Sequence, residues 1–369
     1  MDKKRCIIHF PFYIDEKFPS GSNIRPIEFM KAFKDIGYDV DVIMGYGKER
    51  KGAIKKIKDN IANGAKYSFV YSESSTEPTI LTEKNHIPKY AFLDFNFFKF
   101  CKKNGLKIGL FYRDIYWVFD EYKNRVPFHK RYPAVACYKY DLKMYNKFVD
   151  VLYLPSMKMY EYIPFDFTGN VAELPPATEI DKVSELNNIN IDNKNILKIF
   201  YVGGISKLYN IQKLFQAVKE KKYVELTVCC RKNEWENEKH IYEKYLCDRI
   251  NIVHKSGDEL IPYFEEADLF SLFFEPNEYR KFSMPVKLFQ YLGYAKPIIS
   301  TSNTATGDFV KKYDIGWELD YSTEELLNLF DKIYDNKLCL DNKIKNIKAI
   351  IKDNTWKARA NQVEKDLSI

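Results

Sequence analysis

The feature that most constrains the fold is a repeated alternation along the chain. Short apolar runs are followed by segments whose apolar residues recur at helical spacing. The runs cover 6–12, 39–44, 67–71, 107–112 and 149–154 in the first half, and 197–202, 223–229, 250–254, 267–273 and 296–300 in the second. Strands that alternate with helices favour parallel sheets with right-handed crossovers. The sequence therefore predicts an α/β chain with two doubly wound sheets.

The alternation is interrupted once, at Pro175-Pro176, and the polar stretch 184–195 that follows is typical of a linker. We expect one domain over 1–176, a second over 177–345, and a last helix over 346–369 that packs back toward the first. A chain of 369 residues is long enough for two cores. Ligands bind at the carboxyl ends of such strands, so two facing crevices would form one deep cleft.

Composition excludes several classes of protein. The net charge is +7, from 58 basic and 51 acidic residues spread along the chain. This mild excess suits an anionic small molecule or an anionic membrane surface, and we expect no nucleic acid. No strand is followed by GxGxxG, which disfavours an NAD-dependent oxidoreductase.

The cysteines and histidines indicate no cofactor. The seven cysteines include no CxxC pair, so we interpret them as free thiols in a reducing cytoplasm. No His, Cys and carboxylate spacing indicates a metal site, and no metal is expected. No run of about 18 apolar residues is present, so no membrane span is predicted.

The segment 275–301 contains the clearest candidate for a binding site. An apolar strand leads into a basic loop, then a helix start at Ser283-Met284-Pro285. Arg280, Lys281 and Lys287 would add charge to the partial positive charge of the helix N-terminus, which suits a phosphate. The alternative is an ordinary strand–loop–helix with solvated charges.

A second candidate is the glycine pair Gly203-Gly204, directly after the strand 197–202. Paired glycines let a backbone approach a phosphate closely, and Lys207 follows them. The alternative is a plain tight turn. Arg231 ends the strand at 224–230, where it would lie near a base or phosphate.

The run Pro285-Val-Lys-Leu-Phe-Gln-Tyr-Leu292, followed by Gly-Tyr-Ala-Lys-Pro297, resembles the donor-binding signature of GT-B glycosyltransferases. The resemblance is to the large retaining family that includes many capsule and lipopolysaccharide enzymes. It implies two tandem Rossmann-like domains that face a deep cleft, and a nucleotide-sugar donor, UDP-linked in first place. The donor-binding residues it implies are Gly203, Gly204, Lys207, Arg231, Tyr279, Arg280, Lys281, Ser283, Met284, Pro285, Val286, Lys287 and Gln290.

The chain departs from that family at two positions. Gln290 stands where the family usually has a Glu that holds the ribose, and Phe282 stands where it has an earlier Glu. Glu278, four residues upstream of Phe282, is the substitute candidate for a catalytic carboxylate. These departures leave donor identity and stereochemistry open, and they keep a non-catalytic protein that binds a nucleotide sugar as the alternative. An epimerase is disfavoured because no suitable His and carboxylates are seen.

The first half supplies candidates for the acceptor side. Gly21, Ser22 and Asn23 lie in a small loop at the first helix, and such a loop in similar enzymes closes over donor phosphates or acceptor; capping the helix is the plainer role. Arg113, Asp114 and Tyr116 follow the strand 107–112. Asp114 would be the general base of an inverting enzyme or a sugar-positioning group of a retaining one. The alternative is a structural Arg113–Asp114 pair or a helix cap.

The segment 122–148 interleaves Lys and Arg with Tyr and Phe. Such a face could rest on anionic lipid headgroups, and a solvated helix face is the alternative. Together these observations predict a metal-independent glycosyltransferase in surface polysaccharide or glycoconjugate assembly. We expect it in the cytoplasm, at the inner face of a membrane, with a glycan, lipid-linked or protein acceptor.

Overall fold

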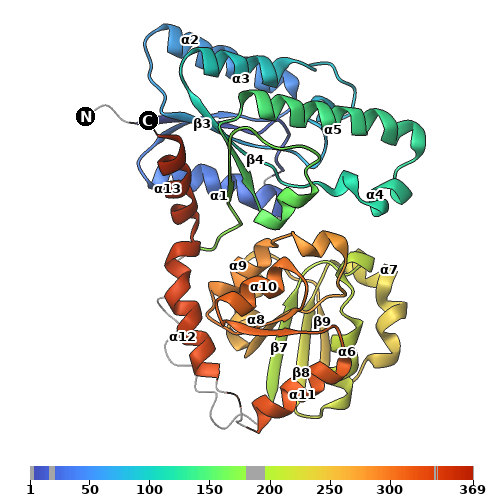
Figure 1. The fold of residues 1–369 in the computed structure, drawn as a ribbon. Coiled ribbons are helices and arrows are strands. Elements are labelled where there is room, and N and C mark those ends of the chain that lie inside the picture. The colour runs from blue at the N-terminus through green and yellow to red at the C-terminus, as the bar shows by residue number, and fades with distance from the viewer. Residues whose placement is uncertain (1–3, 16–20, 180–195, 336–337, 339, 369) are drawn as a thin grey trace. The chain divides into compact units, whose positions relative to one another are not determined.

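The computed structural model describes residues 4–15, 21–179, 196–335, 338 and 340–368. The predicted linker 184–195 lies outside the described residues. The chain forms two compact units (Figure 1). Unit 1 consists of Met1–Pro175 and Trp356–Ile369, and unit 2 consists of Pro176–Thr355.

Unit 1 is built on a six-stranded sheet in the order β2-β1-β3-β4-β5-β6, and each neighbouring pair is parallel. Its elements are β1 (Arg5–His9), α1 (Gly21–Asp35), β2 (Asp39–Ile43), α2 (Gly47–Ala62), β3 (Phe69–Glu73), η1 (Thr79–Leu81), α3 (Leu93–Lys103), β4 (Lys107–Phe111), η2 (Tyr116–Val118), α4 (Asp120–Arg125), α5 (Phe128–Phe148), β5 (Val151–Leu154), η3 (Met157–Tyr162), β6 (Asn170–Glu173) and α13 (Trp356–Leu367).

Helices cover both faces of this sheet, with α2, α3 and α5 on one face and α1 and α13 on the other (Figure 1). The last helix is therefore part of the core of the first unit. The ring of Trp356 contacts Phe29 of α1, with centroids 5.6 Å apart. A Cβ at Gly109 of β4 would lie 2.8 Å from Leu367, so the glycine lets α13 pack closely on the sheet.

Unit 2 has a second six-stranded sheet in the order β12-β11-β10-β7-β8-β9, again with every pair parallel. Its elements are β7 (Leu197–Val202), η4 (Lys207–Tyr209), α6 (Gln212–Glu220), β8 (Val224–Cys229), α7 (Lys232–Tyr242), η5 (Glu243–Tyr245), β9 (Ile250–Val253), η6 (Gly257–Leu260), α8 (Ile261–Glu266), β10 (Leu269–Leu272), η7 (Glu278–Lys281), α9 (Val286–Leu292), β11 (Ile298–Thr301), α10 (Ala305–Lys312), β12 (Gly316–Leu319), α11 (Thr323–Tyr334), α12 (Leu340–Ile350) and η8 (Ile351–Asn354).

Helix α9 is fixed to the centre of the second sheet by its apolar side. Tyr291 stacks on Phe270 of β10, with ring centroids 4.3 Å apart. Its hydroxyl accepts the backbone N–H of Val202, the last residue of β7, at 3.1 Å. Leu288 and Leu292 are fully buried on the same helix. These contacts set the position of α9 against the end of β7, which decides where Lys287 points.

The two parallel sheets confirm the predicted α/β architecture of two Rossmann-like units. The C-terminal segment differs from the single helix expected over 346–369. It contains the end of α12, the short turn η8 and then α13, and only α13 belongs to unit 1. In the described part of the chain, no helix is both long and apolar enough to cross a membrane.

Candidate functional site

The candidate site of unit 2 lies where two neighbouring parallel strands end. Strand β7 ends at Val202 and runs into Gly203-Gly204, and β10 ends at Leu272 and leads through η7 to α9. The carboxyl ends of adjacent strands lie at one edge of a sheet, so both loops meet there. The N–H of Gly203 bonds to the carbonyl of Cys229 in β8 at 2.8 Å, which fixes the start of the glycine turn.

Lys287 of α9 lies directly against this turn. A Cβ added to Gly203 would be 1.8 Å from Lys287 Nζ, so any larger residue here would displace the amine from the turn. The rings of Tyr201 and Tyr209 lie 5.6 and 5.3 Å from Nζ. Burial, followed by the positive charge of Arg280, lowers the pKa of Lys287 to about 7. An anion at the turn would oppose both effects by Coulomb attraction and favour the ammonium form.

Arg280 provides a second, buried cation beside Lys287. Its side chain is 5% exposed, and its guanidinium lies 4.2 Å from the ring centroid of Tyr209 and 4.7 Å from that of Phe274. Nη2 donates to the carbonyl of Leu208 at 2.8 Å, which ties η7 to the glycine turn's loop. The buried Nε of Arg280 has no hydrogen-bond partner.

Ser283 adds a neutral group to the same loop. The residue is 8% exposed, and its buried hydroxyl has no hydrogen-bond partner. Buried polar atoms are rarely left without partners in folded proteins. Unsatisfied donors on both Arg280 and Ser283 therefore indicate a loop built to hold a ligand with several acceptor oxygens.

A carboxylate also faces the glycine turn. Glu234, in the first turn of α7, accepts the backbone N–H of Ile205 at 3.3 Å through Oε2. Its Oε1 pairs with Arg231 Nη1 at 2.5 Å. Glu234 raises the pKa of Lys287, whereas Arg231 and Arg280 lower it. Among the described residues around the turn, three cations thus face one carboxylate, an excess that suits a dianion.

Other residues implied for donor binding lie elsewhere on these loops. Lys207 is exposed at the start of η4. Lys281 pairs with Glu278 at 2.6 Å, and both side chains are about half exposed. Helix α9 has seven residues and begins at Val286, so we assign no anion-binding role to its N-terminus.

Four further residues of the segment 275–301 lie in or beside the core of unit 2. Phe282, where the similar family has a carboxylate, is 1% exposed and packs edge-on against Tyr279, with centroids 5.2 Å apart. Met284 packs against the core of unit 2, Pro285 directly precedes α9, and Gln290 is half-buried on α9. Phe282 therefore serves packing, not ligand binding.

Unit 1 places a buried charged cluster at the carboxyl ends of β3 and β4. Glu73 is fully buried and accepts from Arg25 Nε at 3.0 Å, Arg113 Nη2 at 2.9 Å and the hydroxyl of Tyr71 at 2.7 Å. Arg25 Nη1 is buried with no hydrogen-bond partner, and the guanidinium lies 3.5 Å from the ring centroid of Phe111. Burial, opposed by the charge of Glu73, lowers the pKa of Arg113.

In this cluster Arg113 Nη2 pairs with Glu73 Oε2 at 2.9 Å, and the structural Arg113–Asp114 pair stays an alternative. Asp114 accepts the backbone N–H of Tyr116, the first residue of η2, at 2.7 Å through Oδ1. The ring of Tyr116 lies edge-on to Tyr122. Gly21, Ser22 and Asn23 form the first residues of α1. A catalytic role of Asp114 stays a prediction.

A second buried cluster in unit 1 has the atoms of a hydrolytic triad but no access to solvent. His9 Nδ1 lies 2.8 Å from Ser72 Oγ, and Nε2 lies 2.9 Å from Asp94 Oδ1. Arg50 binds both oxygens of Asp94 at 3.1 Å. All four residues are at most 2% exposed. The cluster therefore serves to join β1, β3, α2 and α3.

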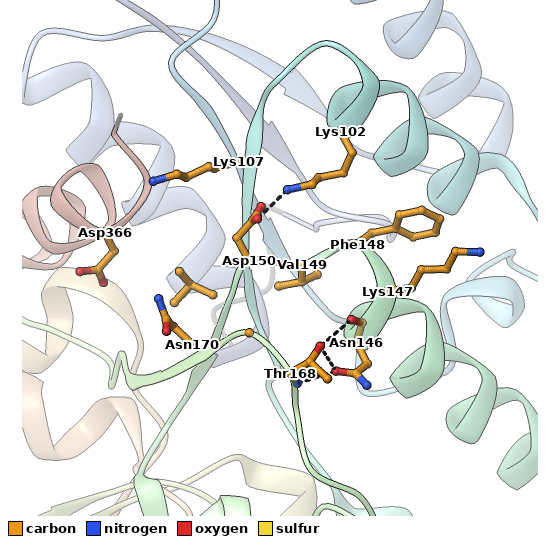
Figure 2. Close-up of a pocket in the computed structure, with 12 residues that line it drawn as sticks. Lys102, Lys107, Asn146, Lys147, Phe148, Val149, Asp150, Thr168, Asn170 and Asp366 are labelled. Atoms are coloured by element: carbon orange, nitrogen blue, oxygen red, sulfur yellow. Dashed lines mark hydrogen bonds and ion pairs between the residues drawn. The ribbon is translucent and has the colours of Figure 1, made fainter.

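A groove of about 390 Å³ opens in unit 1 at the other edge of the sheet (Figure 2). It is lined by Lys102, Lys107, Asn146, Lys147, Phe148, Val149, Asp150, Val151, Thr168, Gly169, Asn170 and Asp366. Lys102 pairs with Asp150 at 2.5 Å, and Thr168 bonds to Asn146 (Figure 2). Because the groove lies at the amino ends of β4, β5 and β6, away from the edge where such sheets bind ligands, we assign it no role.

The chain matches no protein-family model and no curated protein sequence. Its fold is that of the GT-B glycosyltransferases, shown by solved structures that align over nearly the whole chain. One is a sucrose-phosphate synthase from Thermosynechococcus elongatus, with 12% identity, a TM-score of 0.63 and 98% of each chain covered.

Two further structures share this fold. HepE of Anabaena, solved in complex with UDP-glucose, has 11% identity and a TM-score of 0.65, over 98% of this chain and 99% of that one. WaaG, a glycosyltransferase involved in lipopolysaccharide biosynthesis, has 11% identity and a TM-score of 0.62, over the same shares. The likeness places the chain in a fold class and assigns it no substrate.

Proposed function

We propose that the chain is a glycosyltransferase that takes a sugar from a nucleoside-diphosphate donor bound to unit 2. The observation that carries the proposal is the position of Lys287 Nζ against Gly203, beside the buried Arg280. A diphosphate leaving group needs cations and N–H donors where its charge develops. These groups lie at the strand ends where open α/β sheets bind their ligands.

UDP is the favoured nucleotide. The supporting observation is the shared fold with HepE, which was solved with UDP-glucose. We further propose that transfer is metal-independent, since Arg280 and Lys287 can offset the charge of the leaving diphosphate. The acceptor is proposed to be a glycan, lipid-linked or protein group in surface polysaccharide or glycoconjugate assembly.

Thermal unfolding with UDP, GDP, CMP and dTDP sugars tests donor binding. A ligand at about a hundred times its dissociation constant adds about 2.7 kcal/mol to the free energy of unfolding. We expect stabilisation by UDP sugars first, and a weaker effect in Lys287→Ala. Lys311→Ala is the control, because Lys311 is exposed on α10 and pairs with Glu318 at 2.9 Å. Equal stabilisation of both variants would contradict the proposed site.

The alternative is a protein that binds a nucleotide sugar without transferring it. The buried Phe282 and the exposed Glu278–Lys281 pair favour it, because neither offers a carboxylate held in place. Transfer to acceptors separates the two functions. If Asp114 is catalytic, Asp114→Ala abolishes transfer and leaves donor stabilisation intact, while Asp120→Ala, at an exposed residue paired with Lys123, changes neither.

A membrane contact is proposed for the tip of unit 1, residues 123–132, where α4 ends and α5 begins. Phe128 is 69% exposed and Tyr132 is 71% exposed, with ring centroids 6.0 Å apart. Lys123, Arg125, Lys130 and Arg131 belong to the same short segment. Exposed aromatics with basic neighbours suit an anionic headgroup layer. We therefore propose that the enzyme acts in the cytoplasm, at the inner face of a membrane.

Sedimentation with vesicles of phosphatidylcholine and phosphatidylglycerol tests the tip. We expect binding that increases with the anionic lipid and falls in Phe128→Ser/Tyr132→Ser. Phe92→Ser is the matched control, because Phe92 is 63% exposed outside the tip. Equal binding by the wild type, the double variant and Phe92→Ser would show that the tip makes no membrane contact.

A further inference from the structure

The glycine turn after β7 carries a carboxylate at the place where the proposed function needs a phosphate. Oε2 of Glu234 lies 3.3 Å from the backbone N of Ile205, which donates to it. The same oxygen lies 3.3 Å from the position that a Cβ of Gly204 would take. The carboxylate therefore rests on the glycine turn itself, and it takes an N–H that a diphosphate oxygen would use.

The charges around Glu234 exceed what one carboxylate requires. Arg231 pairs with its Oε1, and Arg280 and Lys287 add two further cations. The charges of Arg280, Glu234 and Arg231 all act on the pKa of Lys287. A nucleoside diphosphate that carries a sugar brings two negative charges. It would therefore match these cations better than a single carboxylate does.

The contacts that hold Glu234 are easily exchanged. A separation of 3.3 Å is at the long end for an N–H···O hydrogen bond. Arg231 is 52% exposed, and ion pairs at such exposure are weak because water competes for both charges. Glu234 is itself 24% exposed in the first turn of α7, so its side chain can rotate into water. A phosphate oxygen can form a shorter bond with the N–H of Ile205 and a charge-assisted bond with Arg231.

We propose that Glu234 is an internal competitor of the donor, which occupies the N–H of Ile205 and the guanidinium of Arg231 until a diphosphate displaces it. The inference rests on the proposed function, because it assumes a diphosphate at this turn. A protein whose site is competent for only part of the time binds with an affinity reduced by that fraction. When UDP leaves, the returning carboxylate takes over its donors and so favours release.

The test is the affinity for UDP, measured by calorimetry on the full chain. Glu234→Gln keeps the shape and an acceptor oxygen but removes the charge. If the carboxylate occupies the turn about nine-tenths of the time, this variant binds UDP about tenfold more tightly. Glu234→Asp retracts the carboxylate by one methylene and should also bind more tightly, by a smaller factor.

Glu236→Gln is the matched control, since Glu236 lies on the same helix and pairs with the exposed Lys239 at 2.8 Å. Equal or weaker binding of UDP by Glu234→Gln overturns the inference, because a structural or ligand-contacting role gives no gain in affinity. If neither the wild type nor Glu234→Gln binds UDP, GDP, CMP or dTDP, the proposed function fails and the inference fails with it.

Discussion

The low pKa of Lys287 leads to a pH dependence of donor affinity that can be worked out in advance. Its pKa of about 7 results first from burial and then from Arg280, with Glu234 acting in the opposite direction. A diphosphate that binds the ammonium form raises this pKa, so binding takes up a proton. The affinity is then full below about pH 7 and falls as the pH rises through the pKa of the free protein.

UDP-glucose is the probe, because its diphosphate carries two esters and does not titrate in this range. If only the ammonium form binds, the affinity falls about fivefold from about pH 7 to about pH 8, and about fiftyfold by about pH 9. Burial raises the pKa of the nearby Cys229 thiol above its usual range, and that of Tyr201 far above its own, which leaves Lys287 to account for the change.

Calorimetry in buffers of different ionisation enthalpy measures the proton uptake directly. We expect close to one proton taken up per UDP-glucose near pH 8, and none by Lys287→Met, whose weaker binding should not vary with pH. Folding shows the opposite sign. Since the pKa falls on folding, the contribution of Lys287 to the free energy of unfolding increases with pH between about 7 and the ordinary 10.5. A wild-type affinity that is flat from pH 6 to pH 9 would refute the reasoning.

Three further predictions concern single residues. Gly203→Ala places a Cβ 1.8 Å from Lys287 Nζ and should reduce UDP affinity about tenfold or more. Gly52→Ala on α2 is the control, because a Cβ there has no atom within 4 Å. This variant should bind UDP normally and gain up to about 1 kcal/mol of stability. Glu73→Gln leaves the buried Arg25 and the partly buried Arg113 without their carboxylate and should cost about 3–5 kcal/mol in urea unfolding; a loss below about 1 kcal/mol would show that the cluster is solvated. Burial raises the pKa of Asp141 to about 7, so the folded state holds this proton more tightly than the unfolded state does. The free energy of unfolding should therefore fall by as much as about 4 kcal/mol as the pH rises from about 4 to about 7. Asp141→Asn should flatten that profile, and an unchanged slope would disprove the assignment.

The sequence contained most of the architecture, because buried parallel strands appear as short apolar runs and their helices as periodic ones. It also contained the two loops that meet in unit 2, since Gly203 and Lys287 each follow an apolar strand in the pattern. Glu73 could have been found by the same rule that found Asp114, because it too stands at the carboxyl end of an apolar strand.

Other residues had no such signal. Glu234 lies in the charged run 232–239, which is typical of a solvated helix, and only the fold turns its carboxylate toward the glycine turn. Arg25 lies on an amphipathic helix 48 residues before the Glu73 that binds it, and local patterns carry no information on such distant pairs. The exposure of Lys207 could not be deduced either, since a basic residue after a glycine pair fits a buried and an exposed position equally well.

The return of α13 to unit 1 has a consequence for how the protein is made. The ribosome completes the first sheet early, but the helix that shields Phe29 and Gly109 is made only after the whole of unit 2. Until then the nascent first unit shows an apolar surface to chaperones, and a premature stop before Trp356 leaves it uncovered for good. The speed at which unit 2 is translated should therefore influence the yield of active protein.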